Sequence, residues 1–284
     1  MSTILITGAS GFIGNALARG MSSRHHVICM SRRNPEVATV AYLPGDFAAF
    51  EDLRQLDAHH VDVVVHLAAV TGGCRERDGM LVNGEGTRCL MRYLIDHGCR
   101  KFVMASSIAL VGFQSPGFRP LQAPIPDEHP CLDRDGYGFS KHLMEQVTHY
   151  HVLQNPAIDV INLRLSTVLP DDARPDGMRD LGPWSLGGIT VTLLSDAVKL
   201  FALAAEAKHK PGVRTMNASC ARIWASVPTA KLLRHWWGNE VDLRHFEQPG
   251  HAYDSPYDVT RLTKELGFEA KKTLAILDEV QTET

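Results

Sequence analysis

Short runs of apolar, β-branched residues alternate along the first part of the chain with longer segments whose apolar residues recur at helical spacing. The short runs predict strands, and the longer segments predict helices. The predicted strands are residues 3–7, 27–30, 40–43, 61–68, 101–107 and 158–165. The predicted helices between them are residues 12–23, 50–56, 83–98 and 137–153.

After residue 165 this alternation gives way to turn-rich sequence. Residues 170–177 and 181–188 are rich in proline and glycine, which favour turns. Helical patterns return in residues 195–208, 228–237 and 258–266. The last residues, 281–284, are polar and are expected to fray.

The predicted strands of the first 165 residues are apolar at successive positions, as in the sequence VDVVVHLA of residues 61–68. Strands of this kind are buried on both faces, which is typical of a parallel sheet with helices on either side. The pattern therefore predicts an α/β fold, a Rossmann-type doubly wound parallel sheet over residues 1–165. A smaller lobe is expected over residues 166–284, with some segments returning to the main sheet.

Composition narrows the classes of function. The 284 residues are 44% hydrophobic and 21% charged, with a formal net charge of −3 and scattered basic residues. This balance does not favour a nucleic-acid partner. No apolar run approaches the roughly 20 residues of a membrane-spanning helix, and the N-terminus enters a strand without the features of a secretory signal. We therefore expect neither a nucleic-acid nor a membrane partner.

Cysteines and histidines give no sign of a metal site. The 6 cysteines are widely spaced without a CxxC pair, and the 14 histidines include no HExxH or similar grouping. We interpret the cysteines as reduced, mostly buried thiols of a cytoplasmic protein. No metal is expected, since the histidines fit surface or core positions better than a ligand set.

The sequence ILITGASGFIGNALARG, residues 4–20, places three glycines at three-residue intervals between a predicted strand and a predicted helix. Each glycine gives up a packing side chain and costs backbone entropy, so the spacing indicates a turn that needs a bare backbone. In this context Gly8 permits a tight turn, Gly11 lets a pyrophosphate approach the backbone, and Gly14 lets the helix pack closely. Free N–H groups at the start of the helix then face the phosphates of a dinucleotide.

The spacing TGxxGxxG resembles that of the short-chain dehydrogenase/reductase superfamily, and TGASGFIG resembles its extended branch, which includes nucleotide-sugar epimerases and dehydratases. The resemblance continues through nearly the whole chain. Further segments similar to family motifs are GDF (45–47), HLAA (66–69), VNGEGTRCLM (82–91), ASSIALVG (105–112), PIPDEHPCLDRDGYGFSK (124–141) and TLLSDAVKL (192–200).

This resemblance implies a nicotinamide dinucleotide on the first domain, with Asp46 near the adenine and residues 66–69 under the cofactor. It also implies a homodimer that pairs through two helices, including the one with the catalytic tyrosine. The expected cofactor-binding residues are Gly8, Ser10, Gly11, Phe12, Ile13, Gly14, Arg32, Arg33, Asp46, Phe47, Leu67, Ala68, Ala69, Asn83, Tyr137 and Lys141.

The sequence YGFSK places Tyr137 and Lys141 four residues apart on one helix, so their side chains project from the same face. A nearby ammonium stabilises a phenolate and lowers the pKa of the phenol from its usual value of about 10. Tyr137 can then exchange a proton with a carbonyl or alcohol oxygen, while Lys141 also holds the nicotinamide ribose. Ser107 takes the family's third catalytic position, where its hydroxyl hydrogen-bonds the same oxygen. The adjacent Ser106 takes that role if the register is shifted by one.

The end of the second predicted strand bears on the choice of nicotinamide cofactor. An NAD-selective site has a carboxylate there that accepts from the ribose 2′-OH, whereas this chain reads MSRRN, with Ser31, Arg32 and Arg33. Guanidinium groups suit a 2′-phosphate by charge and by bidentate geometry. We therefore expect NADP(H). The alternative is that the arginines form a solvated turn in an enzyme that uses NAD.

The resemblance weakens on the expected substrate side. Nucleotide-sugar members usually carry Asn-Val-Tyr-Gly-Pro after the sixth strand, where this chain has Thr167 and Pro170 in place of the asparagine and the glycine. These departures put a nucleotide-sugar substrate in doubt without touching the proton-transfer residues. The candidates for substrate contact are Ser107, Ser166, Thr167, Trp184 and Arg214. For all but Ser107, an ordinary structural role is an equal alternative.

The leading hypothesis is an oxidoreductase or epimerase that moves a hydride between NAD(P) and a carbonyl or secondary-alcohol carbon of a sugar or nucleotide-sugar-like substrate, with Tyr137 as acid/base. NADP preference favours net reduction, and the family pattern favours epimerisation or dehydration. One alternative is an NADPH-dependent reductase of a non-sugar aldehyde or ketone. Another is a protein that holds the dinucleotide without turnover, because fold alone does not establish activity.

Overall fold

The computed structural model describes residues 1–173 and 178–270. They form two compact units that interleave along the chain. Unit 1 consists of Met1–Ser106, Asp135–Leu163 and Val198–Thr215. Unit 2 consists of the described residues among Ser107–Arg134, Arg164–Ala197 and Met216–Thr284.

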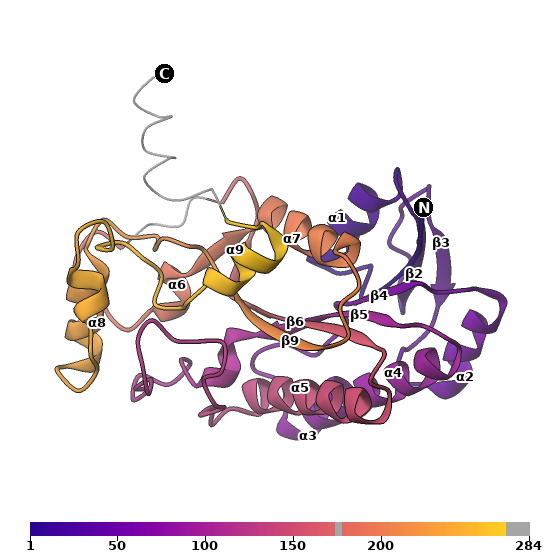
Figure 1. Cartoon of the computed structure of the whole chain (residues 1–284), viewed down its shortest axis with the longest axis horizontal. Helices are drawn as coiled ribbons and strands as arrows, with labels where there is room; N and C mark the ends of the chain where they lie inside the picture. The colour runs from indigo at the N-terminus through magenta and orange to yellow at the C-terminus, as the bar shows by residue number, and fades with distance from the viewer. Residues whose placement is uncertain (174–177, 271–284) are drawn as a thin grey trace, which may run out of the picture. The chain divides into compact units, whose positions relative to one another are not determined.

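A seven-stranded parallel sheet organises unit 1 (Figure 1). Its strands are β1 (Thr3–Thr7), β2 (His26–Ser31), β3 (Ala41–Pro44), β4 (Val63–His66), β5 (Lys101–Ser107), β6 (Asp159–Leu165) and β9 (Gly212–Ala218). Their spatial order is β3-β2-β1-β4-β5-β6-β9, so the chain starts inside the sheet and winds to both sides. This is the topology of a doubly wound Rossmann-type fold, and the predicted fold class is confirmed.

The central strands of this sheet are buried because they are apolar at nearly every position. All four residues of β4 are buried, and Ile4 of β1 lies opposite Val27 on one side and Val63 on the other. Because these strands run parallel, their carboxyl ends lie at the same edge of the sheet. The loops that follow β1, β2, β3 and β4 therefore come together at that edge, where ligands of open α/β sheets bind.

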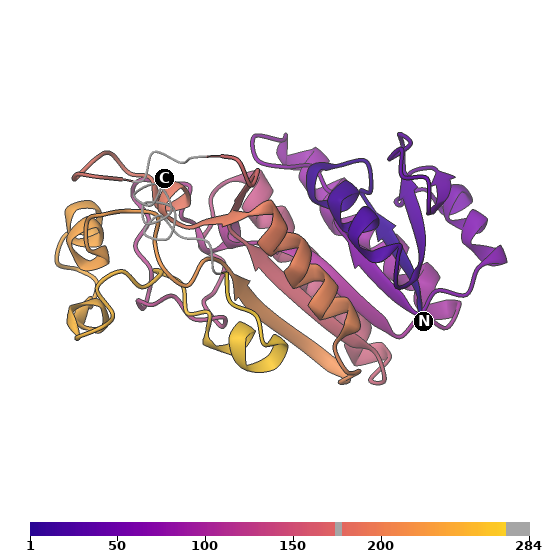
Figure 2. The same cartoon turned by 90° about the horizontal axis from the view of Figure 1, so that it is seen from above.

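Helices cover both faces of the sheet (Figure 1, Figure 2). One face carries α1 (Phe12–Met21) and α7 (Leu194–Glu206). The other face carries α2 (Phe50–Leu53), η1 (Arg54–Ala58), α3 (Glu76–Gly79), η2 (Met80–Gly86), α4 (Thr87–Asp96) and α5 (Gly136–Gln154). Leu90, Met91 and Leu94 of α4 pack against Leu5 and Val64 of the sheet, which joins helix and strands in one core.

The structure differs from the sequence expectation at several elements, among them η2 and β9. The predicted helix over residues 83–98 begins earlier, as a π-helical turn, η2, that continues into α4. In this turn the Asn83 carbonyl accepts a hydrogen bond from the Thr87 hydroxyl, 2.7 Å, and π-helical turns often occur at functional sites. The edge strand β9 was not predicted, because its sequence GVRTMNA mixes polar and apolar residues without strict alternation.

Unit 2 has its own apolar core. Its elements are η3 (Ile108–Val111), β7 (Thr167–Leu169), α6 (Leu186–Ile189), β8 (Val191–Leu193), α8 (Thr229–Trp237), η4 (Arg244–Glu247) and α9 (Thr260–Leu266). The core includes Trp237, Phe246 and Tyr257, and β7 and β8 form a parallel pair. The predicted turn-rich segment 170–177 is described only in part, and the predicted frayed end, 281–284, lies outside the described residues.

In the part of the chain that the structure describes, no helix combines the length and the apolar character needed to cross a membrane. The 6 cysteines all lie in this part and have free thiols. Burial raises the pKa of Cys29, Cys99 and Cys220 to about 12, so these three thiols stay protonated at neutral pH.

Candidate active site

A glycine turn joins β1 to α1 at the carboxyl edge of the sheet. Gly8 has a φ of +70°, and a Cβ there would lie 2.6 Å from the backbone nitrogen of Ala68. A Cβ at Gly14 would lie 2.3 Å from the Gly8 carbonyl oxygen, and one at Gly11 would lie 3.1 Å from it. Side chains at Gly8 and Gly14 would therefore collide with backbone atoms, so this turn keeps its shape only with glycine.

The first turn of α1 has backbone N–H groups to offer a ligand. Gly11 is the N-cap residue without a side-chain hydrogen bond, and the turn contains no acidic residue. The Asn15 N–H donates to the Gly11 carbonyl, 2.9 Å. The N–H groups of Phe12, Ile13 and Gly14 precede that bond, at the positive end of the helix dipole. A bare turn with free amides fits the negatively charged pyrophosphate of a dinucleotide.

The other loops at this edge carry most of the remaining residues expected to bind the cofactor. They are Arg32, Arg33, Asp46, Phe47, Leu67, Ala68 and Ala69, whereas Ser10 lies in the glycine turn itself. Arg32 and Arg33 follow β2 and are exposed, and neither guanidinium has a hydrogen bond or ion pair with another residue in the described ranges, 1–173 and 178–270. The Ser31 hydroxyl donates to the Arg33 carbonyl, 2.7 Å, which stabilises the backbone of this turn.

Asp46 and Phe47 follow β3. Asp46 Oδ1 accepts a hydrogen bond from the Ala48 N–H, 3.0 Å. The Phe47 side chain is buried and packs edge-on against the His66 ring, with 4.8 Å between ring centroids. The Phe47 ring therefore belongs to the core beneath the loops, while Asp46 remains part-exposed at the edge.

His66, at the end of β4, is buried and opens the segment 66–69 expected under the cofactor, but the sequence analysis assigned no separate role to its imidazole. Its Nδ1 lies 2.7 Å from the Thr7 hydroxyl and its Nε2 lies 3.1 Å from Thr87 Oγ1. Because the Thr87 hydroxyl donates to the Asn83 carbonyl, its oxygen accepts from His66, which puts the imidazole proton on Nε2. Burial, with a smaller contribution from the Lys141 ammonium, lowers the pKa of His66 to about 3. His66 is thus neutral at physiological pH.

Asn83 connects the loop after β4 to helix α5. Its Oδ1 accepts from the Val70 N–H, 3.0 Å, and its Nδ2 donates to the Val70 carbonyl, 3.0 Å, and to Ser140 Oγ, 2.9 Å. The Ser140 hydroxyl donates in turn to the Tyr137 carbonyl, 2.7 Å. The Asn83 side chain is therefore engaged within the protein, and a direct contact with the cofactor stays a prediction.

Tyr137 and Lys141 lie on the first two turns of α5. The Asp135 carboxylate caps this helix by accepting from the Tyr137 N–H, 2.8 Å. The buried Lys141 Nζ donates to the Ala105 carbonyl, 2.7 Å, and lies 5.9 Å from the centroid of the Tyr137 ring. Burial lowers the pKa of Lys141 to about 8, against the opposing effect of the Glu145 carboxylate. At neutral pH an ammonium group is therefore held beside the phenol.

Ser106 and Ser107, at the end of β5, differ in what their hydroxyls do. The Ser106 hydroxyl donates to the buried Glu145 carboxylate, 2.6 Å. Ser107 Oγ accepts from the Ala109 N–H, 3.1 Å, which leaves its hydroxyl proton to be donated elsewhere. Neighbouring residues of a strand point to opposite faces, so the two serines are not interchangeable.

The remaining substrate candidates divide between contacts within unit 2 and one buried pair in unit 1. Ser166 Oγ lies 2.9 Å from Thr192 Oγ1, and Thr167 opens β7 with an exposed side chain. The Trp184 indole donates to the Phe113 carbonyl, 2.9 Å, within the aromatic part of the unit 2 core. Arg214 is buried in unit 1, where its guanidinium donates to a carboxylate oxygen of β6, 2.7 Å. The structure therefore gives Trp184 and Arg214 structural roles.

A sequence profile of the NAD dependent epimerase/dehydratase family matches residues 4–180, well over half of the chain. The chain belongs to this family. The resemblance to extended short-chain dehydrogenases/reductases is thereby confirmed.

Curated relatives share part of this sequence. UDP-glucose 4-epimerase 2 of Oryza sativa subsp. japonica is 29% identical over 196 residues, which cover 62% of this chain and 46% of that protein. The dTDP-4-dehydro-6-deoxyglucose reductase of Escherichia coli is 25% identical over 211 residues, which cover 69% of this chain and 65% of the reductase. The chain spans about half the length of the rice epimerases that it matches.

Solved structures share the fold along nearly the whole chain. A short-chain dehydrogenase/reductase superfamily protein from Agrobacterium tumefaciens with bound NAD has a TM-score of 0.71 at 23% identity, covering 99% of this chain and 96% of that one. UDP-glucose 4-epimerase from Thermotoga maritima with UDP-glucose has a TM-score of 0.68 at 19% identity, covering 99% and 100%.

Proposed function

We propose that this enzyme transfers a hydride between NADP(H) and a carbonyl or secondary-alcohol carbon of a sugar or nucleotide sugar, with Tyr137 as the acid/base. The observation that carries the proposal is the buried Lys141 ammonium, bonded to the Ala105 carbonyl and 5.9 Å from the centre of the Tyr137 ring. The matched relatives include a UDP-glucose 4-epimerase and a dTDP-4-dehydro-6-deoxyglucose reductase, which supports a sugar nucleotide as the substrate class.

Tyr137, Lys141 and Ser107 each have a different role in the proposed proton transfer. The nicotinamide dinucleotide, when bound, supplies the hydride chemistry. The Tyr137 phenol gives a proton to the substrate oxygen in reduction and removes it in oxidation. The Lys141 ammonium stabilises the phenolate, and because the pKa of Lys141 is about 8, this charge is present at neutral pH and is lost as the solution becomes more alkaline. The Ser107 hydroxyl, free to donate, hydrogen-bonds the same substrate oxygen.

Replacing the phenol tests this assignment. Tyr137→Phe removes only the hydroxyl, and we expect kcat/KM to fall by about 10² to 10⁴-fold, the usual contribution of a general acid/base. The substrates are nucleotide sugars, ketoses and aldehydes, assayed with each cofactor. Tyr253→Phe is the matched control, because its hydroxyl donates a long, 3.4 Å hydrogen bond to the Ser226 carbonyl within unit 2. Equal rates for Tyr137→Phe and the native enzyme would remove the proposed mechanism.

The preference for NADP(H) rests on the turn after β2. Arg32 and Arg33 present two exposed guanidinium groups where an NAD-selective site needs a carboxylate. The double variant Arg32→Ala/Arg33→Ala should weaken NADP(H) binding far more than NAD(H) binding, because only NADP(H) carries the 2′-phosphate. Arg54→Ala, which removes another exposed arginine, should leave both affinities unchanged. An unchanged NADP/NAD ratio in the double variant would contradict the preference.

A second candidate is net reduction of a non-sugar aldehyde or ketone, which the same arginine pair favours because NADPH is the usual cellular reductant. The state of the cofactor distinguishes the two reactions. An epimerase or dehydratase returns the hydride, so we expect purified enzyme to hold its nicotinamide tightly and to show no net consumption of NADPH. A reductase releases the oxidised cofactor and consumes one NADPH per product formed.

We also propose a homodimer that pairs through α5. Phe139, Tyr150 and Leu153 lie on the exposed side of this helix, with 38%, 50% and 82% of their surface accessible. Their spacing places them along one stripe, and the resemblance to the family implies pairing through this helix. Leu153→Lys should shift the mass measured by light scattering from dimer to monomer, whereas Leu121→Lys, at an exposed position of unit 2, should not. A native chain that stays monomeric at every concentration would refute the pairing.

A further inference from the structure

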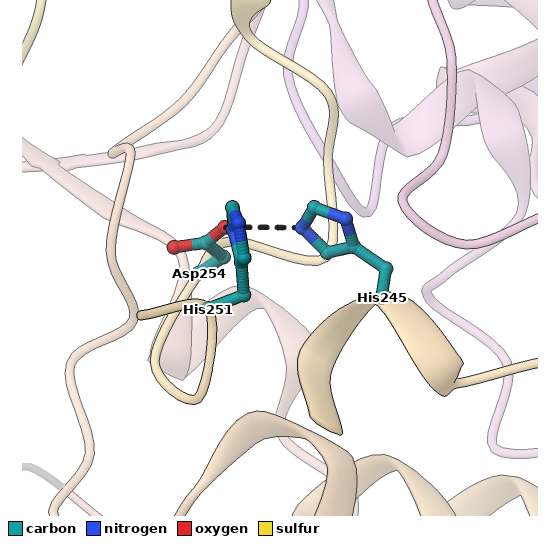
Figure 3. Close-up of side chains that lie close together, drawn as sticks. All are labelled: His245, His251 and Asp254. Carbon is teal, nitrogen blue, oxygen red and sulfur yellow. Dashed lines mark hydrogen bonds and ion pairs between the residues drawn. The ribbon is translucent and has the colours of Figure 1, made fainter. Parts of the chain in front are cut away.

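Two histidines and an aspartate meet in unit 2 (Figure 3). His245 Nε2 lies 3.0 Å and His251 Nδ1 lies 2.6 Å from the same oxygen, Asp254 Oδ2. The three ligand atoms all lie within 4.8 Å of one another, and both imidazoles point toward the carboxylate. Among residues 1–173 and 178–270, this is the one group of three or more histidine, cysteine or acidic side chains close enough to share a metal ion.

The backbone holds these three side chains in place before any ion binds. His245 lies on η4, next to the buried Phe246. The Asp254 N–H donates to the His251 carbonyl, 3.1 Å, in a tight turn, and the Thr229 hydroxyl donates to the Asp254 carbonyl, 2.8 Å. Thr229 is the first residue of α8, so this hydrogen bond ties the turn to that helix. Because the backbone is fixed in this way, binding an ion would order only a few side-chain torsions.

The distances fit a zinc-type ion with small side-chain movements. Zinc binds histidine nitrogen and carboxylate oxygen at about 2.0–2.2 Å, so a tetrahedral ion separates its ligand atoms by about 3.3 Å. The two nitrogen–oxygen distances of 3.0 and 2.6 Å are each within 1 Å of that value. Two imidazoles and one carboxylate are a donor set that suits zinc better than calcium or magnesium, which prefer oxygen ligands.

The exposure of the cluster leaves a route for the ion and a position for water. The side chains of His245, His251 and Asp254 are 34%, 42% and 30% accessible. Each imidazole can bind an ion through the nitrogen that faces Asp254 once that nitrogen carries no proton.

We propose that His245, His251 and Asp254 bind one zinc-type divalent cation, with water as the fourth ligand, and that the ion ties η4 to the 251–254 turn. No ligand motif in the sequence predicts this site, because His-x5-His-x2-Asp is not a familiar ligand spacing and the fold brings the three residues together. None of these residues belongs to the proposed dinucleotide site.

The experiment uses full-length protein without a histidine tag, stripped with a chelator and dialysed against ZnCl2. We expect one zinc per chain, together with a higher midpoint of thermal unfolding, because an ion that binds only the folded state stabilises it. The 4 tryptophans all lie in unit 2, so their fluorescence follows the unfolding of this unit. Replacing zinc with Co²⁺ should give the visible absorption bands of a four-coordinate centre.

Variants decide whether these residues are the ligands. His251→Ala and Asp254→Asn should each abolish stoichiometric zinc binding and the thermal shift. His60→Ala is the matched control, because His60 also faces a carboxylate, Asp62, at 3.2 Å but lacks a third ligand. If native protein binds no zinc and gives no Co²⁺ bands, the cluster is only a hydrogen-bonded structural contact. If the variants bind zinc as native protein does, other histidines are responsible; both results overturn the proposal.

Discussion

His66 makes the stability of unit 1 depend on pH in a way that can be calculated from its surroundings. Its imidazole is buried between Thr7 and Thr87 and has a pKa of about 3, whereas an imidazole in the unfolded chain has a pKa of about 6.5. Between about pH 3 and pH 6.5 the imidazole is protonated in the unfolded chain but not in the folded chain. The contribution of His66 to the free energy of unfolding is therefore fully present above about pH 6.5 and decreases as the pH falls toward 3.

The size of this loss follows from the two pKa values. At pH 5 the single proton taken up on unfolding costs about 2 kcal/mol of stability, and at pH 4 it costs about 3 kcal/mol, relative to pH 7. Since folded domains are stable by only about 5–15 kcal/mol, one residue removes a large share of the margin. His66→Gln keeps a hydrogen-bond acceptor and a donor but cannot be protonated, so its pH dependence should be weaker by these amounts.

Urea unfolding at pH 7, 5 and 4 measures the effect, followed by far-UV circular dichroism. Tryptophan fluorescence is unsuitable because all 4 tryptophans lie in unit 2, whereas His66 lies in unit 1. The informative quantity is the stability difference between pH 7 and pH 5 in each protein, since any constant cost of the substitution cancels. His60→Gln, at a side chain that is 74% exposed, should behave as the native chain does. If native protein and His66→Gln lose the same stability on acidification, the imidazole is protonated in the folded state and the reasoning fails.

Three further substitutions test the site. Gly14→Ala would put a Cβ 2.3 Å from a backbone oxygen of the glycine turn, so we expect a loss of about 1–3 kcal/mol on thermal or urea unfolding, together with loss of dinucleotide binding. Gly20→Ala on the same helix, where the nearest atom would be 3.7 Å away, should cost nothing. Ser106→Ala removes one hydroxyl donor from the buried Glu145 carboxylate and should lower stability by about 1–3 kcal/mol. Ser107→Ala should instead lower kcat by about 10² to 10³-fold, with little change in melting temperature; the reverse pattern would exchange the two serines.

Much of the fold and part of the site could be predicted because apolar runs, glycine spacing and helical periodicity depend on residues close together in the sequence. A continuous apolar run such as residues 63–65 is typical of a strand buried on both faces, and the sheet has that strand at its centre. The close contacts of Gly14 are with Gly8 and Ala9 of its own turn, so the glycine spacing predicts this turn, whereas the contact of Gly8 with Ala68 joins segments far apart in the sequence. Tyr137 and Lys141 share a helix face by helical geometry alone.

What could not be predicted depends on partners that are distant in the sequence. Glu145 accepts from Ser106, 39 residues away, and the Asn83 amide reaches the Ser140 hydroxyl, 57 residues away. Neither pair has a spacing that identifies it. The ion pair of Arg214 could not be predicted for the same reason. A lone arginine in the sequence does not reveal the carboxylate that it contacts when β6 and β9 pair.

The buried charges of the site act on one another and have to be considered together. The Lys141 ammonium, which the proposed mechanism places beside the Tyr137 phenol, is disfavoured by its own burial and helps to keep His66 neutral. The Glu145 carboxylate, held by the Ser106 hydroxyl, opposes the effect of burial on Lys141. A neutral imidazole places no second positive charge near the ammonium, and a carboxylate one helical turn away favours keeping the first. We therefore interpret His66 and Glu145 as residues that help to keep Lys141 charged in the apolar interior, which is the condition on which the proposed acid/base chemistry at Tyr137 depends.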